Sequence, residues 1–228
     1  MGFELGPLAT VATWLALVFA VAWGLHRRQA EGEWVRKVVH IGTGNVVLLA
    51  WLLGLPWTGC LAVAGLFTAI AFLSSYFPLL PFLENAGRKT RGVFYYALSI
   101  FILVGIFGWQ QHLEFAVLGT LVMAWGDGLA ALVGKRWGQH PYTVWSGQKS
   151  WEGSTAMAIA SYCVTYGVLA IARHHFWPDH GSDVWLPLPV ALLATTLEAW
   201  SPGGTDNLSV PLGAAIAGFG LSQWLMQG

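Results

Sequence analysis

Long runs of apolar residues alternate with short polar segments along almost the whole chain. A helix needs about 20 residues to cross the hydrocarbon core of a bilayer, and most of these runs approach that length. The pattern therefore predicts up to eight membrane-spanning helices. They are expected at residues 7–25, 38–53, 57–77, 93–109, 115–133, 153–172, 184–200 and 208–226.

The last two runs give the weakest signal for a span. The run at 184–200 carries Pro187 and Pro189 near its start, and proline removes a backbone donor from a helix. Several runs are also shorter than a straight span prefers, so one of these segments could instead be re-entrant or interfacial. We predict an all-α, polytopic integral membrane bundle with seven or eight transmembrane helices.

The basic residues indicate which ends of the helices face the cytoplasm. Ten of the eleven Lys and Arg residues lie in the segments 27–37, 88–91 and 135–149, which join the predicted helices two by two. Cytoplasmic loops are enriched in Lys and Arg. These segments are therefore expected on the cytoplasmic side, with the N-terminus outside.

Composition is that of a membrane protein with one domain. Of the 228 residues, 56% are hydrophobic, 10% are charged and 14 are tryptophans. No soluble second domain is evident, so residues 1–228 are expected to form a single transmembrane domain. The formal net charge is +0 and no zinc-ligand spacing or long basic run is present, so nucleic acid is not an expected partner.

One acidic residue lies inside an apolar run. An unpaired carboxylate such as that of Asp127 costs roughly 2.5 to 3.5 kcal/mol at the bilayer centre, so a cationic partner is expected. Around it, Gly126, Ala130, Gly134 and Gly138 recur at every fourth position. On a helix they form a ridge that another backbone or a nucleotide can approach closely.

A run of polar side chains follows, just before the next apolar run. It supplies an ammonium group, two hydroxyls and a carboxylate, in the order Lys149, Ser150, Glu152, Gly153 and Ser154. By type these groups bind phosphates and metal ions. Lys135, between the two groups of residues, is a further candidate cation for a phosphate.

A second polar cluster lies near the C-terminus and contains Glu198, Gly204, Asp206 and Asn207. The glycines are also ordinary turn residues, and Asp206 could equally cap the helix that follows. Both polar clusters are expected on the cytoplasmic side. Two loops with acids and glycines on one face are what a magnesium–nucleotide site requires, because glycine amides cradle phosphates and carboxylates hold the metal.

A third group opens the second predicted helix. Arg36 and Lys37 are residues that often anchor a helix at the headgroups, and they could also bind phosphates. His40 lies one helical turn from Arg36 and could hydrogen-bond a phosphate or a substrate hydroxyl. A buried histidine that is satisfied by a backbone carbonyl is equally consistent with the sequence.

Four motifs in this order resemble those of the CTP-dependent polyprenol kinases, which include phytol kinase, dolichol kinase and CTP-dependent diacylglycerol kinase. They are Arg36-Lys37-x-x-His40, Gly126-Asp127-x-x-Ala130-x-x-x-Gly134, Lys149-Ser150-x-Glu152-Gly153-Ser154 and Asp206-Asn207-x-x-Val210-Pro211. The short length and the opening of the second helix look most like the phytol kinase branch. The resemblance implies a helical membrane enzyme that transfers the terminal phosphoryl group of CTP to a long-chain isoprenoid alcohol, with a divalent metal such as Mg²⁺, and releases CDP.

Roles for the motif residues follow from this resemblance. Asp127 and one of Glu152, Glu198 or Asp206 would hold Mg²⁺, and Asp127, Lys149, Glu152 and His40 are the candidate catalytic residues. The candidate residues for the nucleotide and its phosphates are Arg36, Lys37, Gly126, Gly134, Lys135, Ser150, Gly153, Ser154, Gly204 and Asn207. The bilayer would supply the alcohol, and the cytosol would supply CTP.

Two alternatives remain open on the sequence. The middle motifs also look like those of CDP-diacylglycerol synthase, a membrane cytidylyltransferase, although the loop before Asp206 has fewer acids than that family's signature. A non-enzymatic lipid carrier or small transporter would also place acids and broken helices in the membrane. The carrier does not explain the run from Lys149 to Ser154 as well.

Overall fold

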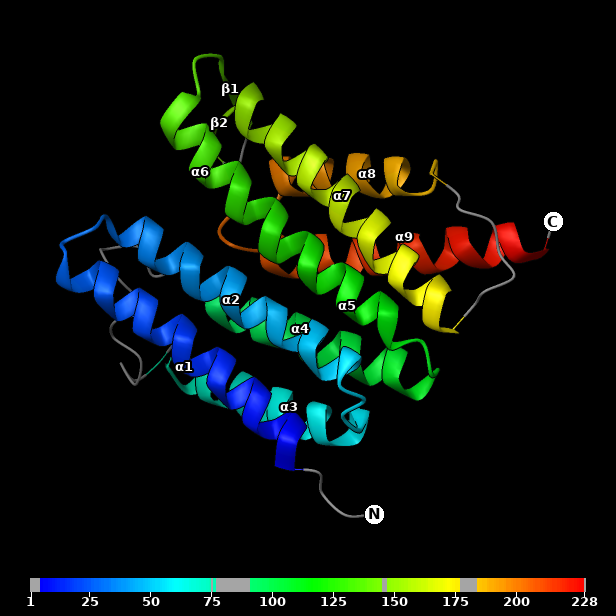
Figure 1. Ribbon diagram of the computed structural model, residues 1–228. Coiled ribbons are helices and arrows are strands. Elements are labelled where there is room, and N and C mark those ends of the chain that lie inside the picture. Colours follow the sequence, from blue (N-terminus) through cyan, green and yellow to red (C-terminus); the bar gives the residue numbers. More distant parts are fainter. Residues whose placement is uncertain (1–4, 75, 77–90, 145–146, 177–183, 228) are drawn as a thin grey trace.

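The computed structural model describes residues 5–74, 76, 91–144, 147–176 and 184–227. These residues form a bundle of helices with one short hairpin (Figure 1). The elements are α1 (Leu5–Arg27), α2 (Gly32–Leu52), α3 (Trp57–Ser74), α4 (Gly92–Trp109), α5 (Leu113–Leu121), η1 (Val122–Asp127), α6 (Gly128–Trp137), β1 (Pro141–Val144), β2 (Gly147–Ser150), α7 (Trp151–Phe176), α8 (Pro187–Trp200) and α9 (Asp206–Gln227).

Each predicted apolar run forms a helix over most of its described length, which confirms the all-α membrane fold. Six helical segments in the described part of the chain are long and apolar enough to span a membrane. These are Leu5–Arg27, Trp57–Ser74, Gly92–Trp109, Leu113–Trp137, Trp151–Arg173 and Asp206–Leu225. The helix α8 has 14 residues, fewer than a straight span needs, and α2 carries charges in its first turns. Whether these two cross the membrane stays a prediction.

The second helix begins at Gly32, before the apolar run from which it was predicted. Its first turns are polar, so hydrophobicity alone places the start too late. Glu33 bonds to Arg36 three residues on, a spacing that brings two side chains together on one face of a helix. Arg36, Lys37 and His40 therefore lie on a regular helix.

The middle of the bundle is one continuous helical stretch made of α5, η1 and α6. In α5, every residue from Glu114 to Leu121 is buried, and the stretch contacts α2, α4, α7 and α9. Figure 1 shows it as the green helix that other helices surround. The part η1 is a π-helix, a form that adds one residue to a turn and is found frequently at functional sites. It ends at Asp127.

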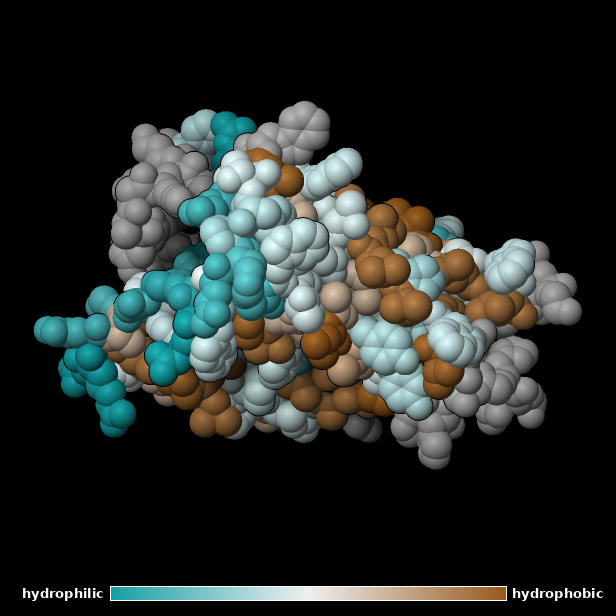
Figure 2. All heavy atoms as spheres, turned by 90° about the horizontal axis from the view of Figure 1, so that it is seen from above, coloured by the Kyte–Doolittle hydropathy of each residue, from teal (hydrophilic) through white to brown (hydrophobic). Residues whose placement is uncertain are grey.

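The remaining helices pack around this centre mainly as neighbouring pairs. The pairs are α1 with α2, α3 with α4, α7 with α8, and α8 with α9. The hairpin of β1 and β2 lies at one end of the bundle, between the end of α6 and the start of α7 (Figure 1). Hydrophilic side chains gather at that same end, while hydrophobic ones cover much of the rest of the face that Figure 2 shows.

Topology can be tested at the two ends of the central stretch. Gln148 lies on the hairpin and Gln110 lies at the opposite end, just before α5, and both are exposed. In a background with Cys60 and Cys163 replaced by alanine, a cysteine at Gln148 is expected to react with an impermeant maleimide from the cytoplasm. A cysteine at Gln110 should react only from the other side. Labelling in the reverse pattern would contradict the predicted orientation.

Candidate active site

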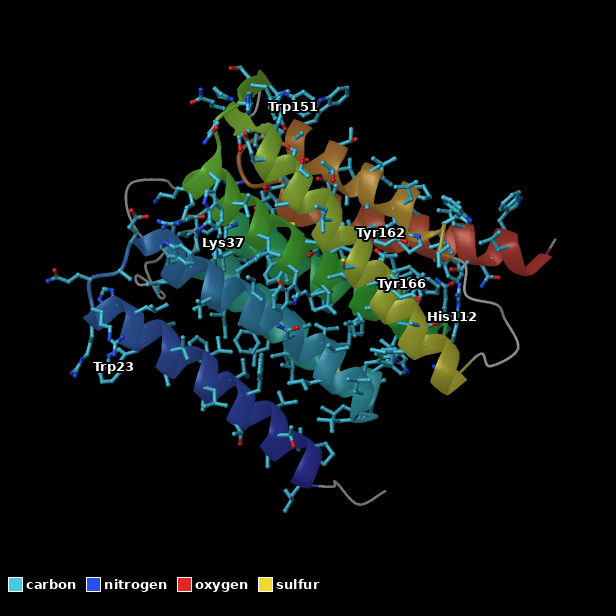
Figure 3. All side chains as sticks on the ribbon, turned by 45° about the horizontal axis from the view of Figure 1, so that its top comes forward. Trp23, Lys37, His112, Trp151, Tyr162 and Tyr166 are labelled. Carbon is cyan, nitrogen blue, oxygen red and sulfur yellow. The ribbon has the colours of Figure 1, made fainter. Side chains whose placement is uncertain are left out.

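A buried ion pair joins α2 to the end of the π-helix. Lys37 Nζ lies 2.5 Å from Asp127 Oδ2 and also donates to the Asp127 backbone carbonyl at 3.3 Å. The Lys37 side chain is 3% exposed and that of Asp127 is 15% exposed. Figure 3 shows Lys37 on the side of α2 that faces the central stretch. The cationic partner expected for Asp127 is thus Lys37, which belongs to the Arg36-Lys37-x-x-His40 motif.

His40 lies one turn farther along α2 on the same side. Its Nε2 is 3.6 Å from Asp127 Oδ2 and is buried without a hydrogen-bond partner. Tyr96, from α4, covers the imidazole with a ring-centroid distance of 4.2 Å and donates its hydroxyl hydrogen to the His40 carbonyl. The imidazole is therefore held in place while one of its nitrogens remains available.

Arg36 lies at the edge of this pair. Its guanidinium donates two hydrogen bonds to Glu33, at 2.7 and 3.1 Å, and half of the side chain is exposed. Glu33 Oε1 is also 4.0 Å from Lys37 Nζ. This acid therefore balances part of the positive charge that the first turns of α2 bring to the site.

A second ion pair connects the hairpin to α8. Lys149 Nζ donates to the carboxylate of Glu198 and, at 3.2 Å, to the Glu198 carbonyl. Burial alone would lower the pKa of Lys149, but the charge of Glu198 and its hydrogen bond raise it, with further contributions from Asp206 and Asp127. Three carboxylates from α8, α9 and the π-helix therefore act on the same ammonium group.

The loop between α8 and α9 places Asp206 at the first turn of α9. Its Oδ1 accepts hydrogen bonds from the backbone N and the side-chain amide of Asn207, at 3.0 and 3.1 Å. Gly203 and Gly204 have φ values of +61° and +89°. Residues with a Cβ atom rarely adopt such positive φ values, whereas glycine does so readily. These glycines are thus needed for the turn itself, in agreement with their interpretation from the sequence as turn residues.

The small residues of the central stretch give close contacts with α7. A Cβ at Gly126 would lie 2.5 Å from the sulfur of Met157, and one at Gly134 would lie 3.1 Å from Ser150 Oγ. Gly153 faces the same surface, and its N–H donates to Ser150 Oγ at 3.1 Å. The ridge therefore has another backbone as its neighbour, and Ser150 caps the start of α7.

The other candidate residues have partners near the hairpin. Glu152 accepts hydrogen bonds from the backbone and the ring of His140, and Ser154 shares a hydrogen bond of 2.6 Å with the Tyr142 hydroxyl. Lys135 forms an exposed ion pair with Glu31. The contacts of these residues do not include Asp127, so their roles in binding phosphate or metal stay predictions.

Sequence reasoning missed several partners of the site. Glu33 could have been found from the sequence. It lies three residues before Arg36 and four before Lys37, and side chains at these spacings are neighbours on a helix. Tyr96 could not be found in this way, since its place over His40 depends on how α4 packs beside α2. The contact of Tyr142 could not be predicted either, because the pattern of apolar residues does not indicate a hairpin at this position.

The donor set has the chemistry of a magnesium–phosphate site. The described residues contain no group of three or more His, Cys, Asp or Glu side chains that could by itself hold a metal ion. Mg²⁺ in nucleotide sites usually takes one or two carboxylates, with substrate phosphates and waters supplying the other ligands. Asp127, Glu198 and Asp206 supply oxygen ligands of this type, and their role as metal ligands stays a prediction.

Known proteins similar to this chain are kinases of isoprenoid alcohols. The chain is 48% identical over 221 residues to the phytol kinase of Synechocystis sp., a match that covers 94% of this chain and 91% of the relative. It is 29% identical to probable phytol kinase 2 of Glycine max, covering 85% and 67%, and 28% identical to the farnesol kinase of Arabidopsis thaliana, covering 81% and 65%.

No family model and no solved structure matches the chain. The resemblance that the four motifs carry is nevertheless confirmed, because the identity with the phytol kinase extends over nearly the full length of both proteins. The chain belongs to the polyprenol kinase family, with the phytol kinases among its relatives.

Proposed function

We propose that this protein phosphorylates a long-chain isoprenoid alcohol, such as phytol, with CTP at the cytoplasmic membrane face. The products would be the isoprenyl monophosphate and CDP. The observation that carries the proposal is the buried Lys37–Asp127 pair in a chain that is 48% identical to a phytol kinase. Charged groups at membrane depth are costly and are usually kept for function.

The lysines of the two ion pairs are proposed to bind the phosphates. Lys37 is paired with Asp127 and Lys149 with Glu198, so each cation is neutralised within the protein. Nucleotide phosphates would replace the carboxylates as partners of the ammonium groups. Arg36, half exposed beside Lys37, would contact a phosphate from the solvent side.

The carboxylates that the lysines release would then hold Mg²⁺. Asp127, with Glu198 or Asp206, is the proposed set, and the ion would neutralise charge that develops on the oxygens of the transferred group. Mg²⁺ prefers such hard oxygen ligands, so Asp127 and Glu198 would serve as counter-ions of the lysines in the free protein and as metal ligands in the loaded one. Asn207, bonded to Asp206, is proposed to hold that carboxylate in place.

His40 is proposed to meet the alcohol. Its Nε2 is buried, lacks a hydrogen-bond partner and lies 3.6 Å from Asp127, so it can accept a hydrogen bond from the substrate hydroxyl. The alcohol oxygen would bond to the γ-phosphorus of CTP as the bond between that phosphorus and the β–γ bridging oxygen breaks, which releases CDP, and the hydroxyl proton would pass to His40 Nε2. The isoprenoid chain would extend along the apolar helix surfaces, which continue into lipid.

The pairing of Asp127 with Lys37 allows chemistry to be separated from folding. Asp127→Asn is expected to lower kcat at least about 100-fold, because a charged group at the reacting phosphates is lost. It also removes the close partner of the buried Lys37 ammonium and leaves Glu33, at 4.0 Å, as its acidic neighbour, and losing one partner of a buried pair costs about 3–5 kcal/mol. Replacing both partners, in Lys37→Met/Asp127→Leu, should restore the thermal stability but not the activity.

Phosphorylation of radiolabelled phytol and melting in detergent would measure the two effects. Glu31→Gln is the matched control, since it removes a carboxylate from the exposed pair with Lys135 and should change neither quantity much. Turnover at the wild-type rate in the double variant would refute the role of Asp127.

Lys149→Ala should weaken CTP binding about tenfold or more, because a hydrogen bond to a charged group is lost. Calorimetric titration of the purified protein with CTP and Mg²⁺ measures this affinity. Arg136→Ala is the control: Arg136 is an exposed cation near the hairpin that stacks on Trp137, and its loss should leave the affinity unchanged. An unaltered CTP affinity in Lys149→Ala would remove Lys149 from the site.

The products separate a kinase from a cytidylyltransferase. A kinase breaks the bond to the γ-phosphate and releases CDP, whereas attack at the α-phosphate releases pyrophosphate. With CTP, Mg²⁺ and phytol or geranylgeraniol, we expect CDP in an amount equal to the isoprenyl monophosphate. Pyrophosphate formed with phosphatidic acid would contradict the proposal, and consumption of no nucleotide with any acceptor would favour a carrier.

A further inference from the structure

Lys149 differs from Lys37 in the kind of element that carries it. Lys37 lies on a long helix, but Lys149 lies on β2, one of two strands with four residues each. A two-stranded hairpin is marginally stable by itself. The place of the Lys149 ammonium therefore depends on the contacts that fix the hairpin to the helices.

Tyr142 provides such a contact directly opposite Lys149. The two residues are partners in the antiparallel register, so their side chains project from the same face of the hairpin. The Tyr142 hydroxyl shares a hydrogen bond of 2.6 Å with Ser154 Oγ on the second turn of α7. Its ring packs against Trp151 with centroids 5.2 Å apart.

Further contacts attach the hairpin to α7 and α8. Trp151 N donates to the His140 carbonyl, and His140 bonds to Glu152, so the residue before β1 is tied to the start of α7. Lys149 itself attaches the hairpin to α8 through its ion pair with Glu198. If a phosphate replaces Glu198 as the partner of Lys149, the attachment to α8 is lost, while Tyr142 still holds β1 against α7.

We propose that Tyr142 is a positioning residue for Lys149. Through its hydrogen bond to Ser154, it would keep the hairpin in place while Lys149 exchanges Glu198 for a nucleotide phosphate. The inference rests on the proposed role of Lys149 in binding CTP. It also gives Ser154 a different task from direct phosphate binding, since the hydroxyl of Ser154 is engaged by Tyr142.

A double-mutant cycle tests whether Tyr142 acts through Lys149. Tyr142→Phe removes the hydroxyl and keeps the ring, and we expect the Kd for CTP with Mg²⁺ to rise about three- to tenfold, as for one lost hydrogen bond. In the Lys149→Ala background the same change should add nothing, because the group that it positions is absent. The kcat at saturating CTP should stay near that of the wild type.

Two further variants act as matched controls. Ser154→Ala removes the other half of the hydrogen bond and should reproduce the effect of Tyr142→Phe, with no further loss when the two are combined. Thr143→Val changes the neighbouring exposed residue of β1, which pairs with Gln148 on the opposite face, and should leave the Kd unchanged. Thermal stability, measured for every variant, detects a general loss of folding.

The outcomes distinguish the inference from the function on which it rests. Equal effects of Tyr142→Phe with and without Lys149 would overturn the positioning role while leaving Lys149 in the site. So would a wild-type Kd in Tyr142→Phe. An unchanged Kd in Lys149→Ala would overturn both proposals, because neither the cation nor its support would then bind CTP.

Discussion

The structure depends on the need to pair charges that are buried or partly buried among the helices. An isolated ion in a low-dielectric interior loses several kcal/mol of hydration, and the attraction of a partner offsets this only at close range with additional hydrogen bonds. Lys37 meets these conditions, since it donates to both the carboxylate and the carbonyl of Asp127. Lys149 does the same with Glu198. Each pair joins elements that are far apart in the sequence.

These pairs explain how a site for a highly charged ligand can exist in a folded protein before the ligand arrives. Phosphates require cations and Mg²⁺ requires carboxylates, and the free protein must keep both sets neutral. Opposite charges on facing elements satisfy this need. In our proposal the ligand separates the pairs, so that the nucleotide and the metal would each assist the binding of the other.

Packing of the central stretch decides where the pairs can form. The buried helix α5 continues through the π-helix to Asp127, and small residues let α7 approach that stretch closely. Gly134 and Gly153 face each other across the contact with Ser150 between them. A larger side chain at either glycine would push α7 away, and with it the hairpin that carries Lys149. The same contacts thus hold the fold and the spacing of the candidate site.

The sequence by itself determined the class of fold, because apolar runs of this length have few stable places other than a bilayer. It also identified the polar residues that are costly in such a place, from Lys37 and Asp127 to Lys149 and Asp206. Their partners were decided by tertiary structure. Lys37 and Asp127 are 90 positions apart, and Lys149 and Glu198 are 49 apart, so no local spacing relates them. The hairpin and the cover of Tyr96 over His40 likewise arise from packing between distant segments, which hydrophobic periodicity does not record.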